Sequence, residues 1–153
     1  QALLVDVVDF YEPLVEDAGG ILRLDVQEGV QALGDGDLLA SAVSNLVDNA
    51  IKYGASSDDI HGADVLLRAA PAQEQGSDGA WGVEITVQDQ GPGADPQTLE
   101  KMTTRFYRAE SDRPGYGLGL AIAADIARAH GGQLRLGEGE RLGGLRAEIV
   151  IPR

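Results

Sequence analysis

Side chains that suit a metal ion and a phosphate stand close together in the stretch NLVDNAIKY, residues 45–53. Asn45, Asn49 and Lys52 are spaced i, i+4 and i+7, so a helix would place them on one face. Amide oxygens can orient a hydrated Mg²⁺, and a lysine adds a point charge for phosphate. Asparagine is a mediocre helix former, which favours a ligand role for the pair. A polar, solvated helix face is the alternative interpretation of the same pattern.

A second candidate site follows the alternating apolar residues of WGVEITVQD, where the chain reads Asp89-Gln-Gly91-Pro-Gly93. A carboxylate at a strand end can accept a hydrogen bond from an exocyclic amine such as that of adenine. Glycines beside it allow the backbone to approach a ring closely. The same five residues are good turn chemistry in any protein, so an ordinary turn is the alternative.

A third candidate site is a run of glycines that leads into a helical pattern ending near His130. Its residues are Gly115, Tyr116, Gly117, Leu118 and Gly119. Glycine-rich backbone at a helix N-terminus can bind phosphate through its N–H groups and the helix dipole. The run lacks the GK[ST] of a P-loop, and no strand precedes it as in a Rossmann fingerprint. A flexible hinge is the alternative.

The segment between the two glycine motifs has no clear period and carries Phe106, Tyr107, Arg108 and Arg113. An aromatic pair can hold a loop down, and an arginine can reach a phosphate. A surface loop with a hydrophobic anchor is the alternative.

Residue types that bind transition metals are scarce in this chain. There is no cysteine, and His61 and His130 share no ligand spacing with other residues. His130 falls in the last turn of a predicted helix, where a structural role is expected because a cation there favours the helix dipole. We therefore expect no metal apart from Mg²⁺ carried by a nucleotide.

Composition limits the possible functions. The 153 residues, 43% of them hydrophobic, suit one domain with a real core. The formal net charge of −13 argues against a nucleic-acid surface and against contact with an anionic membrane. No apolar run approaches the roughly 20 residues that cross a bilayer. Because the chain starts at Gln1 and its single methionine is Met102, we expect a piece of a longer protein.

Hydrophobic periodicity predicts the elements that would position these residues. Helices are expected over 2–18, 38–53 and 118–130, strands over 21–26, 63–70, 81–89, 133–139 and 144–152, and a short helix over 96–102. Residues 30–34 are expected to pair with strand 21–26, residues 71–80 to form a hairpin loop, and Asp35 or Asp37 to cap the second helix. This order predicts an α/β two-layer sandwich, with helices on one face of a mixed sheet.

Taken together and in this order, the four motifs resemble the catalytic and ATP-binding domain of bacterial two-component sensor histidine kinases. That domain has the Bergerat fold of a superfamily that includes gyrase, heat-shock chaperone and mismatch-repair ATPases. NLVDNAIKY is similar to its N box, DQGPG to its first glycine box, RFYRAE to its F box and GYGLGLAIA to its second glycine box. The resemblance extends from about Leu3 to Ile151, nearly the whole chain.

The resemblance implies a fold and a division of the chain. The fold would be a mixed sheet covered on one face by three helices. Residues 1–153 would form a single ATP-binding domain. Residues 1–18 would be a helix continuing from a dimerisation domain outside this chain, and residues 95–115 would form the ATP lid. We expect the chain alone to be monomeric.

The resemblance also implies roles for individual residues. Asn49 would hold Mg²⁺, Asp89 would accept the adenine amine, and Lys52 would lie on the phosphate and ribose side. The full set implied to bind ATP is Asn45, Asn49, Lys52, Tyr53, Asp89, Gly91, Gly93, Phe106, Tyr107, Arg108, Arg113, Gly115, Tyr116, Gly117, Leu118 and Gly119.

The implied activity is transfer of the γ-phosphoryl group of Mg·ATP to a histidine on a dimerisation domain of the same protein, with a response regulator receiver domain as a further partner. Neither His61 nor His130 has the sequence setting of the family's phosphoacceptor, so autophosphorylation of this chain alone is not expected. Gyrase-like ATPases carry a glutamate base where this chain has Asn45, and an amide cannot take a proton. Efficient ATP hydrolysis is therefore not expected either.

The resemblance implies a cytoplasmic domain of a protein that can be anchored in the inner membrane. Two other functions stay open. One is a degenerate kinase-like module that binds a nucleotide or a partner without catalysis. The other is a self-sufficient ATPase of the same fold, which Asn45 disfavours.

Overall fold

The described part of the chain comprises residues 1–53, 64–73, 80–90, 97, 101, 119–138 and 144–152 of a computed structural model. Its elements, in chain order, are α1 (Ala2–Asp17), β1 (Ile21–Val26), α2 (Gly36–Tyr53), β2 (Asp64–Gln73), β3 (Ala80–Asp89), α4 (Gly119–Ala129), β4 (Gln133–Glu138) and β5 (Leu145–Pro152). The three long predicted helices and the five main strands are therefore present, with ends that differ by a few residues.

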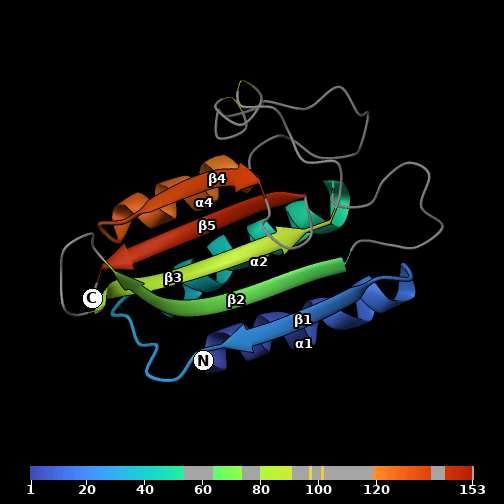
Figure 1. Ribbon diagram of the computed structural model, residues 1–153, viewed down its shortest axis with the longest axis horizontal. Coiled ribbons are helices and arrows are strands. Elements are labelled where there is room, and N and C mark those ends of the chain that lie inside the picture. Colours follow the sequence, from blue (N-terminus) through green and yellow to red (C-terminus); the bar gives the residue numbers. More distant parts are fainter. Residues whose placement is uncertain are drawn as a thin grey trace.

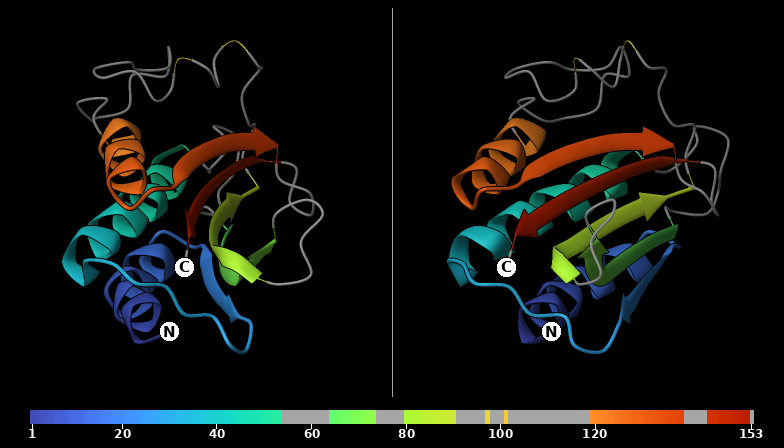
Figure 2. Two further views of the ribbon diagram at one scale, coloured as in Figure 1. Left: turned by 90° about the vertical axis from the view of Figure 1, so that its left-hand side faces the viewer. Right: turned by 60° about the vertical axis from the view of Figure 1, so that its left-hand side comes forward.

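The five described strands form one mixed sheet in the order β1-β2-β3-β5-β4. Strands β1 and β2 are parallel, and the other neighbouring pairs are antiparallel. The parallel pair requires a crossover, which α2 provides. Helices α1, α2 and α4 all lie on one face of the sheet, behind the strands in Figure 1 and to one side of them in Figure 2. The predicted two-layer sandwich is thus confirmed.

The core lies between the helices and one face of the sheet. Alternate residues of β3, namely Val83, Ile85 and Val87, are buried in it, as the predicted strand pattern requires. The buried stripe of α2 packs against them and contains Leu39, Ala42, Val43, Leu46, Val47 and Ala50. Leu38, the first residue of the helix predicted from the apolar spacing, is 45% exposed. Its position on α2 lies outside the face that the sheet covers.

Helix ends follow the expected local chemistry. Asp35 is the N-cap of α2, because its Oδ1 accepts the backbone N–H of Leu38 at 3.1 Å. Gly19 and Gly131 follow the C-terminal ends of α1 and α4 with φ values of 85° and 77°. These left-handed residues let the next N–H groups bond back into the last helical turn.

The predicted pairing of residues 30–34 with β1 was wrong. The N–H of Gln27 donates to the carbonyl of Ala69 on β2, so the chain beyond β1 still bonds to its parallel neighbour. Gly29, with a φ of +76°, then turns the chain, and residues 31–33 run exposed to the start of α2. Residues 30–34 therefore belong to a connecting segment.

Two further expectations concern loops. Strands β2 and β3 run on to Gln73 and back from Ala80, so the hairpin loop is shorter than the predicted 71–80. Of the helix expected over 96–102, only Gln97 and Lys101 are described, and both have helical backbone.

Candidate functional site

Helix α2 presents the first group of predicted site residues. The side chains of Asn45 and Asn49 are partly buried, which fits a face beside the core rather than a fully solvated one. Lys52 Nζ lies 2.8 Å from Asp48 Oδ2, one helical turn earlier. Both side chains of this ion pair are more than one-third exposed, so it contributes at most about 1 kcal/mol to stability.

A tyrosine on the neighbouring helix α1 lies near the Asp48–Lys52 pair. Burial raises the pKa of Tyr11, and the nearby carboxylate of Asp48 raises it further. A hydrogen bond with Ser44 and the charge of Lys52 act in the opposite direction. Tyr11 therefore stays protonated at neutral pH and contacts the outward side of α2 without adding charge. This arrangement was not foreseen from the sequence.

The first residue of α4 lies beside the first asparagine of α2. A methyl group placed on Gly119 would meet Asn45 Oδ1 at 3.8 Å, an ordinary van der Waals contact. Gly119 and Asn45 are 74 positions apart in the chain, and they come from two different predicted motifs. The fold thus brings the start of α4, where a helix dipole favours an anion, against the amide side chain of α2.

Asp89, the predicted adenine-binding acid, ends the central strand β3 and is only 2% exposed. The backbone N–H of Leu145, at the start of β5, donates to Asp89 Oδ1 at 3.2 Å. Helix α2 packs on β3, and Figure 1 shows the C-terminal ends of both directed toward the right-hand side of the molecule. The carboxylate is therefore fixed at the end of the sheet toward which Asn49 and Lys52 also lie.

Neighbouring strand ends are tied together next to Asp89. Asp64, the first residue of β2, accepts the backbone N–H of Ile21 at 3.1 Å and the Nε2 amide of Gln90 at 2.9 Å. Val65 is the residue opposite Asp89 in the β2–β3 ladder. The ends of β1, β2 and β3 are thus joined by one side chain, which the sequence patterns did not indicate.

Several predicted site residues cannot be placed. The residues outside the described part of the chain are Gly91, Gly93, Phe106, Tyr107, Arg108, Arg113, Gly115, Tyr116, Gly117 and Leu118. Tyr53 is the last residue of α2, and its side chain is not described.

His130 has the structural role predicted for it, by a different mechanism. Its Nε2 accepts the backbone N–H of Asp35 at 3.1 Å, and its Nδ1 lies 2.8 Å from the carbonyl oxygen of Ile126. The acceptor role of Nε2 places the proton on Nδ1 and makes the imidazole neutral. His130 therefore links the C-terminal end of α4 to the cap of α2, and no cation is needed there. His61 lies outside the described residues.

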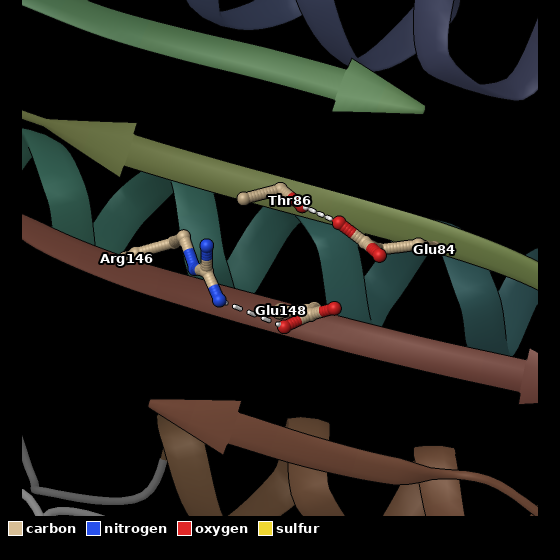
Figure 3. A network of polar contacts seen from close by, with 4 residues as sticks. All are labelled: Glu84, Thr86, Arg146 and Glu148. Carbon is tan, nitrogen blue, oxygen red and sulfur yellow. Dashed lines mark hydrogen bonds and ion pairs between the residues drawn. The ribbon is translucent and has the colours of Figure 1, made fainter. Parts of the chain in front are cut away.

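A second buried acid lies on the sheet face opposite the helices. Figure 3 shows Glu148 on β5 beside Glu84 and Thr86 on β3, with Arg146 on its own strand. Arg146 Nη2 is 3.4 Å from Glu148 Oε2, and Thr86 Oγ1 donates to Glu84 Oε1 at 3.2 Å. Burial raises the pKa of Glu148, and the neighbouring Glu84 raises it further against the attraction of the arginines. The sequence patterns did not indicate this cluster of Glu84, Thr86, Arg146 and Glu148.

Two absences apply only to the part of the chain that is described. Within it, no three His, Asp or Glu side chains gather in a way that would hold a metal ion. Among the helices of the same residues, none is long and apolar enough to cross a bilayer. Amide oxygens such as that of Asn49, together with water, would suit a magnesium ion that arrives with a nucleotide.

Comparison with known proteins identifies the family. The model of the family described as histidine kinase-, DNA gyrase B- and HSP90-like ATPase matches residues 34–153. The chain belongs to this family. The matched residues include Asn45, Asn49, Asp89 and Gly119, whose placement is described above.

Similar curated proteins of this ATPase family are sensor kinases. The probable sensor protein PcoS of Escherichia coli is 39% identical over 137 residues, which cover 87% of this chain and 26% of the relative. Sensor histidine kinase CusS of Escherichia coli K12 is 33% identical over 150 residues, covering 95% of this chain and 28% of the relative. The chain thus spans about a quarter of the length of these relatives.

Solved structures of the family share the fold over nearly the whole chain. The mycobacterial sensor histidine kinase MprB matches with a TM-score of 0.75 and 30% identity, covering 97% of this chain and 93% of that one. The catalytic domain of histidine kinase ThkA matches with a TM-score of 0.77 and 22% identity, covering 99% and 92%. The second match supports the Bergerat-type fold only.

Proposed function

We propose that this chain binds Mg·ATP and donates the γ-phosphoryl group to a histidine on a separate dimerisation domain, as the catalytic domain of a two-component sensor histidine kinase. The observation that carries the proposal is the proximity of Gly119 to Asn45, whose Oδ1 lies 3.8 Å from the place of a Cβ on Gly119, because it brings together two predicted nucleotide-binding motifs that are far apart in the sequence. Family membership and the sensor-kinase relatives support it.

Adenine recognition is assigned to Asp89. Its carboxylate is almost completely buried, and the Leu145 N–H holds one of its oxygens. A carboxylate fixed in this way can accept a hydrogen bond from the exocyclic amine of adenine in a defined direction. A buried polar group also discriminates strongly against a ligand that leaves it without its partner. Gly91 and Gly93, predicted to lie beside the ring, remain part of the proposal.

Phosphate binding is assigned to the α2 face and the start of α4. Asn49 would hold the magnesium ion, whose charge neutralises part of the phosphate charge when it is bound. Asn45, Lys52 and the N-terminus of α4 would face the phosphates. The weak, exposed Lys52–Asp48 pair costs little to rearrange, so Lys52 can exchange its carboxylate partner for a phosphate oxygen.

Transfer to an outside nucleophile fits Asn45 better than hydrolysis does. Phosphoryl transfer depends mainly on positioning and on charge neutralisation, which amides, a lysine and a helix N-terminus can supply. Activation of water needs a group that accepts a proton, and an amide cannot serve. The acceptor histidine and a response regulator receiver domain would be outside this chain. Arg108, Arg113 and the lid segment 95–115 remain predicted contributors.

The binding half of the proposal is tested by calorimetric titration with Mg·ATP. The wild-type chain should bind saturably, and Asp89→Asn should weaken the affinity about tenfold or more, the effect of losing a hydrogen bond to a charged group. Asp25→Asn is the matched control, because it also removes one negative charge but lies on the edge strand β1 beside Arg68. Equal affinities for wild type and Asp89→Asn would end the adenine assignment.

The catalytic half is tested by adding a histidine-containing dimerisation domain from the full-length protein together with γ-labelled ATP. Label should reach that domain only when this chain is present, and it should not accumulate on this chain alone. Saturable ATP binding without transfer would favour the degenerate module. Steady phosphate release by this chain alone would favour a self-sufficient ATPase.

A further inference from the structure

We propose that Gly144, immediately before β5, is a positioning residue for adenine recognition, because only a residue without a side chain lets Asp89 keep its observed conformation. The inference rests on the proposed function and extends it to a residue that none of the four motifs contains. Gly144 and Leu145 act in sequence: the glycine leaves space for the carboxylate, and the next residue donates a hydrogen bond to it.

The space around Gly144 is closed by Asp89 itself. A Cβ atom at position 144 would lie 2.3 Å from the backbone oxygen of Asp89, 2.3 Å from its Oδ1 and 2.7 Å from its carbonyl carbon. Real Cβ atoms essentially never come within 3.0 Å of another residue's heavy atoms. Any side chain at position 144 must therefore displace the carboxylate, the end of β3, or both.

Movement of β3 is the costlier of the two responses. This strand lies in the middle of the sheet, with β2 on one side and β5 on the other. Gln88, the residue before Asp89, is paired with Arg146 on β5, and Val65 on β2 is opposite Asp89. Because two of the three close atoms belong to the Asp89 backbone, rotation of the carboxylate alone cannot relieve the collision, and the end of β3 and residue 144 must also move apart. Both responses shift Oδ1 relative to the Leu145 N–H and weaken that hydrogen bond.

Other tightly packed glycines in the sheet do not share this relation to a ligand-binding side chain. A Cβ on Gly82 would lie 2.1 Å from the backbone oxygen of Ile151, and a Cβ on Gly132 would lie 1.8 Å from that of Val150. Neither set of contacts includes a side chain that is proposed to bind the nucleotide, so replacement of Gly82 or Gly132 should affect stability alone. A Cβ on Gly137, in β4, would meet nothing within 4 Å, which makes Gly137→Ala a matched control.

The test compares ATP with purine riboside triphosphate, which lacks the 6-amino group. Both are titrated as magnesium complexes into the wild-type chain, Gly144→Ala and Gly137→Ala. Wild type and Gly137→Ala should prefer ATP. In Gly144→Ala this preference should fall by about tenfold, as expected when a hydrogen bond to a charged acceptor is lost, and the affinity for purine riboside triphosphate should change less than about twofold. A ratio of two affinities in one variant is insensitive to the fraction of folded protein.

A purely structural role for Gly144 would give a different result. Affinities for both nucleotides would then fall together, or the preference for ATP would persist, and either outcome overturns the inference. If Gly144→Ala is too unstable to titrate, Leu145→Pro is the second variant. It removes the backbone N–H that donates to Asp89, and it should fold because proline is tolerated at the first residue of a strand. Leu145→Pro should abolish the preference for ATP over purine riboside triphosphate, and a variant that keeps this preference would contradict the inference.

The same titrations separate the two proposals. A wild-type chain that binds both nucleotides equally well would contradict the adenine role of Asp89, and with it the proposed function at this site. A wild-type preference for ATP that survives in both Gly144→Ala and Leu145→Pro would leave the function intact and contradict only the positioning role of Gly144.

Discussion

Two buried acids on neighbouring strands of one sheet have opposite surroundings. Asp89 ends β3, is 2% exposed, and accepts a backbone N–H from Leu145. Glu148 lies within β5, is 4% exposed, and has a second acid, Glu84, beside it as well as Arg146 at 3.4 Å. Burial is nearly the same, so the difference lies in what each carboxyl group faces.

This difference distinguishes the acid that we propose to bind adenine from an acid whose burial costs stability. A backbone N–H donor orients the carboxylate of Asp89 at the end of the sheet, where the proposed function places the base. Glu148 belongs to a row across the sheet in which Asp25, Arg68, Thr86, Glu148 and Arg135 stand directly opposite one another. Its raised pKa shows that this row does not fully compensate its buried charge. Depth of burial alone would have ranked the two acids together.

The largest expected difference between the two acids is in nucleotide affinity, measured after each carboxylate is replaced by its amide. Asp89→Asn should weaken Mg·ATP binding about tenfold or more. Glu148→Gln should leave it within roughly twofold, because its surroundings offer strand-to-strand contacts and no motif residue. Calorimetric titration of both variants decides the matter. A comparable loss in Glu148→Gln would mean that the open face of the sheet takes part in binding.

A smaller effect concerns stability as a function of pH. Between its ordinary value of 4.5 and its raised pKa, Glu148 binds its proton more tightly in the native state than in the unfolded chain. Stability is therefore lost as pH rises through that window, and the loss persists above it. Glu148→Gln should raise Tm at pH 7–8 and should have little effect near pH 4.

Thermal unfolding of wild type and Glu148→Gln over this pH range provides the measurement. Asp25→Asn, a surface change in the same row, is the control and should not reproduce the pH dependence. A Glu148→Gln variant that is less stable at pH 7 would show that the arginines outweigh the cost of burial.

The smallest expected effect concerns the hydrogen bond from Thr86 to Glu84, next to Glu148. Thr86→Val keeps the shape of the side chain and removes the hydroxyl that donates to Glu84. It should lower the free energy of unfolding by about 0.5–1 kcal/mol. Its effect should not add to that of Glu148→Gln, because both act on Glu84. Urea unfolding of the two single variants and the double variant measures the coupling, and strict additivity would contradict it.

Much of the fold could be predicted because periodicity reports burial directly. The apolar spacing of Val43, Leu46, Val47 and Ala50 required a helix packed on a sheet, and the alternation of Val83, Ile85 and Val87 required a strand. Strand pairing was harder to predict. Residues 30–34 had a strand-like pattern, yet β1 pairs with β2, which lies beyond a whole helix in the sequence.

For the candidate site, residue types were predictable and their supporting contacts were not. Asn45 and Asp89 stood out because asparagine is a mediocre helix former and because a strand-end carboxylate followed by two glycines can bind an exocyclic amine. Gly144 was expected only as the first residue of the last strand, since its proposed role depends on a strand end 55 positions earlier in the chain. The interaction of Glu84 with Glu148 likewise depends on the register between two strands, which places Glu148 opposite Thr86. Contacts of that kind arise only from the assembled sheet.

Asp89 is attached to the central strand of the sheet, and this has a consequence for how recognition would fail. Central strands commonly open only when the whole domain unfolds, so their amide hydrogens exchange slowest. An acid on such a strand keeps its position and orientation while the termini fray and surface segments move. The part of the molecule that would read the base would then be among the last to lose its shape on heating.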